Sequence, residues 1–309
     1  MNRNSLRTVA ILGGVLAPFG VVSLAFAEDK TTVDTAIIEA ATGLKGSFNK
    51  EENVFKVSKP RSDVAIHVDG WQMPPFMGLT SWAAFTPAHD GQTMLMGDTV
   101  LFEDEVNPAI SAALDNGLEV TALHNHFFFD EPKVYFMHIG GVGDTGVLAA
   151  GVKKIHDKIA EIRAAQPTTP QKSFMGGKIG SPSSISPQYI EKVLGKGQSK
   201  DGMFKVVIGR SATMHGVSVG NEMGVNTWAA FAGSNDEAVV DGDFAMTESQ
   251  LQTVLKAMRR VGINIVAIHQ HMSNEEPRIL FLHYWGLGTA AGLAEAVGAV
   301  VHAQTAVAK

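Results

Sequence analysis

An internal duplication constrains this chain more than any other feature of its sequence. Residues 97–138 recur as residues 242–283 without a gap, at an offset of 145, and the segment Trp-Ala-Ala-Phe at 82–85 recurs at 228–231. Chance does not preserve a register across so many residue types, so the sequence predicts two copies of one folding unit.

Each copy has the same coarse pattern of strands and helices. In the first copy we expect strands around 82–102, then a helix with Asn107 as its N-cap, Pro108 at its first position and Gly117 at its end. Two further strands and a closing helix with an apolar stripe follow. The predicted fold class is therefore α+β: two tandem homologous units, each a mostly antiparallel sheet with helices packed on one face, in a βαββα-like order.

The composition between the copies indicates where the units divide. The stretch 166–184 is rich in Pro, Gly, Ser and Thr and has little periodicity, as expected of a linker. The predicted organisation is a signal peptide at 1–27, a first unit at 28–165, a linker at 166–184 and a second unit at 185–309.

The N-terminal segment has the features of a secretory signal. Arg3 and Arg7 precede an apolar run from Val9 to Leu24, and Ala25-Phe26-Ala27 provides an A-x-A site, so cleavage is expected after Ala27. An uncleaved membrane anchor is the alternative. Later segments lack the roughly 18 uninterrupted apolar residues of a transmembrane helix, so we expect a periplasmic or secreted protein without a stable membrane span after cleavage.

Charge and cysteine content exclude several classes of function. Removal of the signal segment takes away two arginines and no acid, which moves the formal net charge from −6 to −8. A mildly acidic protein is a poor candidate for binding nucleic acid. The chain has no cysteine, so disulfides, thiolate metal ligands and a lipid-modified cysteine are all excluded.

Six of the eleven histidines lie in a pattern that occurs once in each copy. The two patterns are His124-x-His126-x4-Glu131-Pro132-x5-His138 and His269-x-His271-x4-Glu276-Pro277-x5-His283. Residues i and i+2 of a strand point to the same face. A hairpin folded symmetrically about position 131 would place His124 opposite His138, with His126 beside them, and the second copy repeats this geometry. We therefore expect three imidazoles to converge in each unit.

Imidazoles with a carboxylate favour a transition metal over calcium or magnesium. We expect zinc, with copper or iron as alternatives. The predicted metal ligands are His124, His126, His138, His269, His271, His283, Glu131 and Glu276. Each glutamate could instead orient an imidazole from outside the shell or face solvent. The alternative without metal is a face of hydrogen-bonded histidines that forms a polar ligand groove.

Two further pairs of repeated residues are candidates for the site. Asp98 and Asp243 each follow a glycine; a carboxylate there could reach the histidine face, but we interpret Gly-Asp as a turn. Trp82 and Trp228 could stack on a sugar or aromatic ligand, but a tryptophan between small apolar residues is more often in the core.

The repeated segments also resemble a known family. Trp-Ala-Ala-Phe, Ala122-Leu-His-Asn-His126, Ala267-Ile-His-Gln-His271 and Phe281-Leu-His-Tyr-Trp-Gly286 are similar to segments of the LppY/LpqO family of bacterial exported proteins, over nearly the whole chain after the signal segment. The resemblance implies an exported protein that contains a domain of unknown function. Mycobacterial members are named lipoproteins, but this chain lacks the cysteine that such anchoring requires.

Three functions are consistent with these observations. The first is a metal-binding protein that stores, buffers or delivers one ion per unit. The second is a metal-dependent enzyme with an open three-histidine site and Glu131 or Glu276 as general base. The third is a cell-envelope module that binds a polar ligand such as a glycan. Retention of the histidines in both copies favours the first, so the expected partner is a metal ion or a small molecule. The oligomeric state stays open.

Overall fold

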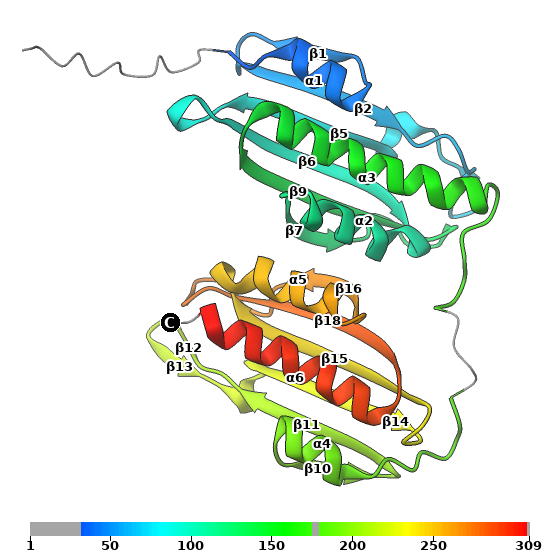
Figure 1. The fold of residues 1–309 in the computed structure, drawn as a ribbon, viewed down its shortest axis with the longest axis vertical. Coiled ribbons are helices and arrows are strands. Elements are labelled where there is room, and N and C mark those ends of the chain that lie inside the picture. Colours follow the sequence, from blue (N-terminus) through cyan, green and yellow to red (C-terminus); the bar gives the residue numbers. More distant parts are fainter. Residues whose placement is uncertain (1–31, 175–178, 308–309) are drawn as a thin grey trace, which may run out of the picture.

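The computed structural model describes residues 32–174 and 179–307, which form two units of the same topology (Figure 1). The predicted signal peptide lies outside the described residues. The predicted α+β class is confirmed, because each unit has a mostly antiparallel sheet with helices packed on it. Residues 166–174 and 179–186, between the units, contain neither helix nor strand.

The described part of the first unit contains three α-helices and the strands of one half of the main sheet. Its main elements are α1 (Thr35–Thr42), β1 (Gly46–Asn49), β2 (Val54–Pro60), β5 (Thr80–Pro87), β6 (Thr93–Phe102), α2 (Glu103–Asp115), β7 (Glu119–His124), β9 (Val134–Gly143) and α3 (Thr145–Ala165). A small side sheet contains β3 (His67–Val68), β4 (Trp71–Gln72) and β8 (Asp130–Glu131). Short 3₁₀ turns are η1 (Pro75–Met77) and η2 (His89–Gly91).

The second unit repeats this order. Its main elements are α4 (Pro187–Leu194), β10 (Gly197–Lys200), β11 (Met203–Gly209), β14 (Asn226–Gly233), β15 (Ala238–Thr247), α5 (Leu251–Arg260), β16 (Asn264–His269), β18 (Ile279–Gly288) and α6 (Ala290–Val307). Its side sheet contains β12 (Ala212–Met214), β13 (Val217–Val219) and β17 (Glu275–Glu276). Its 3₁₀ turns are η3 (Asn221–Met223) and η4 (Glu248–Gln250).

The two main sheets join into one sheet of twelve strands. The order is β1-β2-β5-β6-β9-β7-β16-β18-β15-β14-β11-β10, so the second half is the first half reversed. At the centre, antiparallel β7 and β16 pair through Leu123 and Ile268. These two residues are equivalent under the offset of 145, so a pseudo-twofold axis passes between them.

Among the described residues, the α-helices cover one face of this sheet, and the opposite face carries none (Figure 1). Strand side chains alternate between the two faces. In β5, Ala83 and Phe85 are buried under the helices, and Ala229 and Phe231 repeat this in β14. One apolar cluster runs through both units beneath the helices, so the units share a core.

Reciprocal amide side chains close the seam between the units. The side chain of Asn107 donates to the carbonyl oxygen of Ile265 at 3.1 Å and accepts from its N–H at 2.8 Å. Gln252, the equivalent of Asn107, bonds both backbone groups of Val120 in the same way, at 2.9 and 3.1 Å. Each amide thus satisfies two backbone groups next to an irregularity in the partner unit's strand.

The role predicted for Asn107 is therefore wrong. α2 begins five residues earlier than predicted, at Glu103, and the side chain of Glu105 accepts the N–H of Phe102 at 2.9 Å. Three acidic residues in the first turn favour this start, because they complement the positive end of the helix. Asn107 then lies inside the helix, facing the seam.

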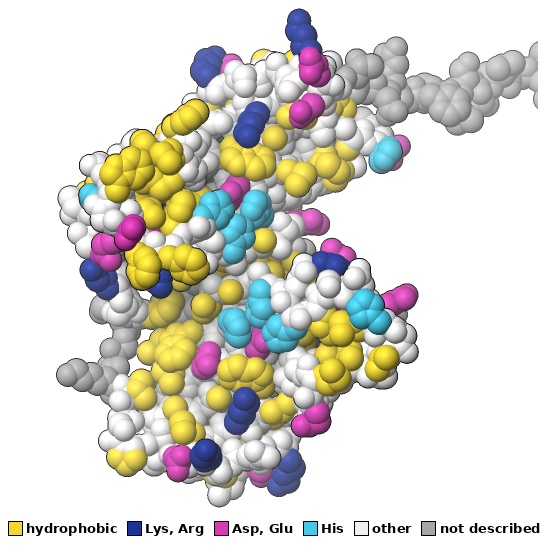
Figure 2. All heavy atoms as spheres, turned by 180° about the vertical axis from the view of Figure 1, so that it is seen from behind, with side chains coloured by type: hydrophobic (Ala, Val, Ile, Leu, Met, Phe, Trp, Pro, Cys, Tyr) yellow, Lys and Arg dark blue, Asp and Glu magenta, His cyan; other side chains and the backbone are white. Residues whose placement is uncertain are grey.

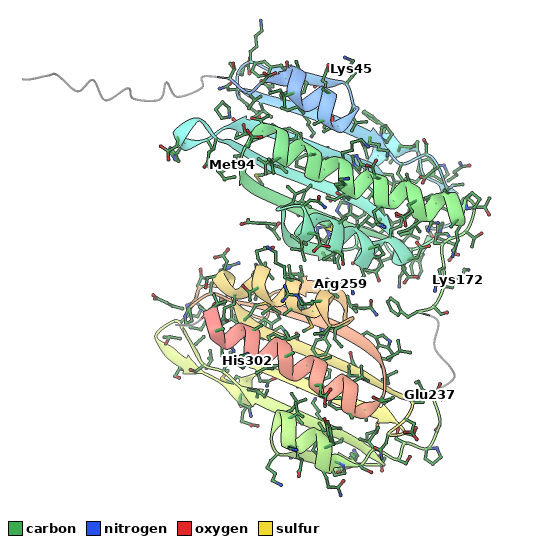
Figure 3. The ribbon with its side chains drawn as sticks, in the orientation of Figure 1. Lys45, Met94, Lys172, Glu237, Arg259 and His302 are labelled. Atoms are coloured by element: carbon green, nitrogen blue, oxygen red, sulfur yellow. The ribbon has the colours of Figure 1, made fainter. Side chains whose placement is uncertain are left out.

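Arg259, near the end of α5, adds another contact across the seam (Figure 3). Its Nε donates to the hydroxyl of Ser111 in α2 at 3.1 Å, and its guanidinium also bonds the carbonyl oxygen of Ile263 at 2.8 Å. Among the described residues, no helix is long and apolar enough to cross a membrane.

Candidate metal centres

The histidines of both patterns lie on the helix-free face of the sheet. Figure 2, which shows this side, has a group of histidine side chains on each half of the molecule, on either side of the hollow between the halves. The first cluster comes from the end of β7, the residues after it, and β9. The second comes from the corresponding parts of β16 and β18.

A strand bulge explains how these histidines reach this face. In β7, Val120 and Leu123 both pack in the core under the helices, although an odd spacing normally places residues on opposite faces. One extra residue, Thr121, breaks the pairing with β9, and Val266 does the same in β16. The bulge changes the alternation, so His124 and His269 point away from the core.

The predicted pairing of the hairpin is wrong by two residues. His124 lies opposite Phe136, and His138 lies opposite Ala122; the second unit repeats this arrangement. The bulge and the loop after β7 shift the register. The predicted hairpin, symmetric about position 131, contains no bulge and therefore no shift. Because the shift is two residues, the rings still share a face, and the centroids of His124 and His138 are 5.1 Å apart.

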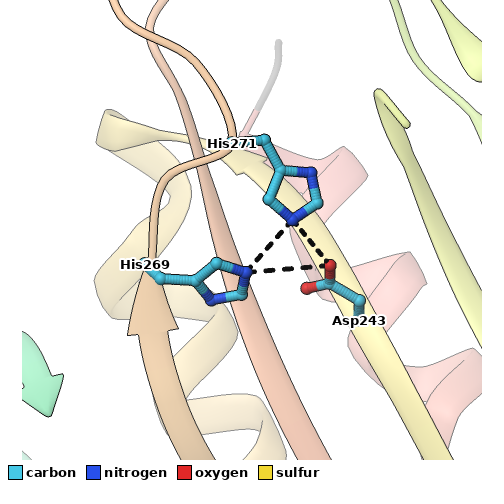
Figure 4. Close-up of side chains that lie close together, drawn as sticks. All are labelled: Asp243, His269 and His271. Carbon is cyan, nitrogen blue, oxygen red and sulfur yellow. Dashed lines mark hydrogen bonds and ion pairs between the residues drawn. The ribbon is translucent and has the colours of Figure 1, made fainter. Parts of the chain in front are cut away.

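The second cluster brings three ligand atoms together (Figure 4). Nε2 of His269 and Nε2 of His271 are 3.1 Å apart. Oδ2 of Asp243 lies 3.1 Å from Nε2 of His271 and 3.9 Å from that of His269. The ring of His283 stacks on that of His269, with centroids 4.5 Å apart. Ligand atoms from β15, from the end of β16 and from the residues after it thus converge, and the ring of His283 from β18 lies beside them.

Backbone carbonyls orient two of these rings. Nδ1 of His271 is 3.2 Å from the carbonyl oxygen of Gly224, and Nδ1 of His283 is 3.3 Å from that of Gly242. A carbonyl can only accept, so each Nδ1 carries the proton and each Nε2 keeps its lone pair. Metal-binding histidines are commonly held in this way.

The first cluster has a similar arrangement of rings. The rings of His124 and His126 stack with centroids 5.1 Å apart. His126 lies flat on Phe136 at 3.4 Å, and His271 lies on Phe281 at 3.5 Å. A phenylalanine therefore supports the second histidine of each His-x-His pair.

An aspartate accompanies each cluster, and the turn interpretation of Asp98 and Asp243 is wrong. Both lie within long strands and are buried, and each pairs directly with a site histidine: Asp98 with His138, and Asp243 with His283. In both, Oδ1 is buried without a hydrogen-bond partner among the described atoms. Buried carboxylates are usually paired or bound to a metal, so these orphaned atoms fit metal ligands. The sequence does not indicate this role, because it depends on the pairing of strands that are far apart in the chain.

Burial shapes the protonation of these groups. It raises the pKa of Asp98, against the opposing effect of nearby His138. Burial also lowers the pKa of His126, helped by His124, and that of His269, although Asp243 opposes the second shift. Neutral imidazoles bind metals, so the two lowered values favour ligation near neutral pH.

The two predicted glutamates lie outside these clusters. Glu131 is in β8, which pairs with β3 in the side sheet. Its side chain is 73% exposed, and its Oε1 lies 3.3 Å from Nζ of Lys172. Glu276 is exposed in β17, paired with Thr213 of β12. Their strands belong to the side sheets, which separates them from the histidines on the main sheet.

The tryptophans of the repeated Trp-Ala-Ala-Phe segment are not fully buried. Trp82 pairs with Asp98, and Trp228 pairs with Asp243, so each points to the helix-free face. The ammonium of Lys56 lies 4.2 Å from the ring of Trp82, and that of Lys205 lies 4.1 Å from the ring of Trp228. The predicted core position is therefore wrong, and each indole is covered by a lysine.

The spacing in the second cluster fits a tetrahedral metal. Bonds of roughly 2.0–2.1 Å to zinc place ligand atoms about 3.3 Å apart. The three separations between ligand atoms of Asp243, His269 and His271 are 3.1, 3.1 and 3.9 Å, close to that value. Small movements of these side chains would therefore suffice to enclose an ion.

Comparison with protein families agrees with the duplication. The model of a family described as Domain of Unknown Function (DUF1259) matches residues 36–158 and 188–303. The chain belongs to this family. Each match lies in one of the two units, so the family domain is present twice. The narrower resemblance to LppY/LpqO proteins stays an expectation from the motifs.

Other comparisons are weak. No curated protein matches the chain. The trimeric bacterial microcompartment shell protein PduB is 11% identical, with a TM-score of 0.22 over 85% of this chain and 91% of that chain. A double-ringed trimeric shell protein of the RMM microcompartment is 13% identical, with a TM-score of 0.19 over 72% and 84%. Likeness at this level does not bear on fold or function.

Proposed function

We propose that the protein binds two transition-metal ions, one in each unit, with zinc as the preferred metal. In the second unit the ligands are Asp243, His269, His271 and His283. In the first unit they are the equivalent residues Asp98, His124, His126 and His138. The observation that carries the proposal is the convergence of three ligand atoms of Asp243, His269 and His271 within 3.9 Å of one another.

Three properties of the clusters support this assignment. Nitrogen and carboxylate donors suit zinc, copper and iron better than calcium or magnesium. Carbonyl oxygens hold the Nδ1 atoms of His271 and His283, which leaves the Nε2 lone pairs for an ion. In both units a buried aspartate, Asp98 or Asp243, has an oxygen without a hydrogen-bond partner among the described atoms and pairs with a site histidine.

We propose storage, buffering or delivery of the ion in an exported compartment. Four protein ligands per centre leave less room for a catalytic water than three would. The enzyme alternative needs a general base within reach, but Glu131 is on the side sheet and paired with Lys172. The glycan alternative needs an open aromatic face, and lysines cover both repeated tryptophans.

Zinc stoichiometry tests the proposal. Protein freed of metal by chelation is titrated with Zn²⁺ and followed by calorimetry, and the bound metal is then counted by elemental analysis after desalting. We expect two ions per chain. The double variant His269→Ala/His271→Ala should bind one, and so should His124→Ala/His126→Ala.

His302→Ala is the matched control. His302 is exposed on α6, on the helix-covered face, so this variant should still bind two ions (Figure 3). Wild-type protein that takes up no stoichiometric zinc, copper or iron would contradict the proposal. Equal loss of metal in the His302 variant would show that binding is nonspecific.

A further inference from the structure

We propose that the second metal centre also takes up a small molecule with a flat apolar body and a metal-chelating group. This ligand would occupy a cavity of about 600 Å³ that opens beside His283. The inference rests on the proposed function, because the metal at this centre would hold the chelating group. It also adds to that function, because it distinguishes the two centres by what they can bind.

The walls of the cavity are mainly apolar. Trp285 and Leu287 continue β18 beyond His283 on the same face, and Val266 lies at the bulge of β16. Phe174, from the segment between the units, also lines the cavity. Ligand pockets are commonly about 300–1,000 Å³ and lined mostly by apolar and aromatic side chains, so this cavity has the size and lining for a small organic molecule.

The first unit lacks these walls, although it keeps the metal-binding residues. Under the offset of 145, Trp285 replaces Gly140 and Val266 replaces Thr121. The position beside His138 that corresponds to Trp285 therefore carries no indole. The segment that contributes Phe174 lines the second unit's cavity and follows the first unit in the chain. The two copies have kept one ligand set but have different surroundings, which indicates different tasks.

The chemistry of the walls defines the ligand. An indole prefers to stack on a flat ring, and burial of a ring against Trp285, Leu287 and Phe174 removes apolar surface from water. His283 is both a cavity wall and a proposed metal ligand, so a donor atom on the ligand would meet the metal from this side. A chelating group brings two donor atoms, so one of the four protein ligands would move aside and zinc would become five-coordinate. The exposed carboxylate of Asp241 at the rim disfavours a body with negative charge.

A pair of hydroxamic acids tests the inference. Benzohydroxamic acid and acetohydroxamic acid share one chelating group, and only the first has a ring. With the zinc-loaded full chain, calorimetry should show one benzohydroxamate per chain, bound at least tenfold more tightly than acetohydroxamate. Trp285→Ala should remove most of this preference while the chain still holds two zinc ions. Trp285→Phe should retain much of it, because it keeps an aromatic wall.

Two controls locate the effect. Trp82→Ala removes a tryptophan from the same face of the first unit and should leave both affinities unchanged. His269→Ala/His271→Ala should abolish tight benzohydroxamate binding, whereas His124→Ala/His126→Ala should retain it.

The outcomes separate this inference from the proposed function. If two zinc ions bind but the two acids bind equally, or if Trp285→Ala has no effect, the cavity inference is wrong and the metal proposal stands. If the wild-type chain binds no zinc, the metal proposal fails, and the inference that rests on it fails as well.

Discussion

At the scale of single residues, the buried aspartates carry the most information. Asp243 is 2% exposed and lies against two imidazoles, and no lysine or arginine forms an ion pair with it among the described residues. A carboxylate in such a place is costly to bury, unless a cation joins it. Burial of Asp243 therefore costs stability in the metal-free protein, and a bound metal ion would offset this cost.

Asp243→Asn provides the first prediction. The amide keeps the shape but removes the negative charge, so zinc affinity at the second centre should fall at least tenfold, about 1.4 kcal/mol. The free energy of unfolding of the metal-free protein should stay the same or rise, because an uncompensated buried charge is lost. Calorimetric titration and urea unfolding measure the two effects.

Asp241→Asn is the matched control, because Asp241 lies two residues earlier on the same strand and is exposed. It should leave zinc affinity unchanged. Unaltered zinc binding in Asp243→Asn, or clear destabilisation of its metal-free form, would contradict a ligand role for Asp243.

His156 on α3 provides a prediction of pH dependence. Burial, helped by the nearby charge of Lys59, lowers the pKa of His156 to about 4. The unfolded chain takes up this proton near pH 6.5 but the folded chain does not, so stability is lost as the pH falls from about 6.5 to 4. The full shift corresponds to roughly 3 kcal/mol, and partial exposure of the ring reduces this to about 1–2 kcal/mol.

His156→Gln should therefore lose less stability than the wild type between pH 7 and pH 5. Urea unfolding at the two pH values, with His302→Gln as an exposed control, measures the difference. Parallel losses in wild type and His156→Gln would show that this imidazole is not held neutral by the fold.

The sequence could predict the histidines but not their carboxylate partners. Repetition and the i, i+2 spacing predict one histidine cluster in each unit, but the predicted pairing is wrong by two residues and the bulges leave no local pattern. Asp98 and Asp243 were candidates, but Gly-Asp is also common in turns. Only the pairing of β6 with β9 and of β15 with β18, which joins residues 40 apart in sequence, places them opposite His138 and His283.

At the scale of elements, the bulges of β7 and β16 link the core to the metal centres. The extra residue lets one short strand bury apolar side chains under the helices and present a histidine on the opposite face. It also leaves the backbone groups of Val120 and Ile265 to be satisfied by Gln252 and Asn107. The seam between the units and the geometry of the sites therefore depend on the same feature.

Replacement of the seam amides should be costly. Asn107→Ala leaves the buried N–H and C=O of Ile265 without partners, and Gln252→Ala does the same for Val120. Each change should reduce the free energy of unfolding by about 2–3 kcal/mol, because unsatisfied buried groups lose their full solvation. Denaturant unfolding measures the loss.

Gln198→Ala, at an exposed position on the edge strand β10, is the control and should stay within about 0.5 kcal/mol of wild type. If both amide variants match this control, the seam bonds contribute nothing to stability.

Local patterns predicted some elements well and missed others. The closing helix predicted from its apolar stripe is confirmed in both units, as α3 and α6. The sequence predicts the start of α2 too late, because Asn followed by Pro is typical of the N-cap and first position of a helix. A tertiary contact explains Asn107 instead, and no local propensity indicates a partner 158 residues away.

At the scale of the whole molecule, two copies of one unit form a single sheet with one shared core. The central pairing of β7 with β16 and the continuous apolar cluster join the units. The sequence predicted two units but not their union, because the joining contacts lie at a pseudo-twofold axis that leaves no pattern of its own. Because the units share one sheet and one core, we expect them to unfold together.

Differential scanning calorimetry of the full metal-free chain should therefore show one cooperative transition, with calorimetric and van't Hoff enthalpies that agree. Saturating zinc should raise the midpoint of that same transition, by about 2.7 kcal/mol of stability per site at 100 times the dissociation constant. Asn107→Ala/Gln252→Ala, which weakens the seam, should broaden or split the transition. Two resolved transitions in the wild type would contradict a shared core.

The most direct test of the two metal centres is anomalous diffraction at the zinc edge from crystals of the zinc-loaded protein. The account predicts two strong peaks per chain. One should lie about 2.0–2.2 Å from the carboxylate of Asp243 and the Nε2 atoms of His269 and His271, and the other should lie at the equivalent atoms of Asp98, His124 and His126. Ordered clusters without a peak, or zinc bound only elsewhere, would contradict it.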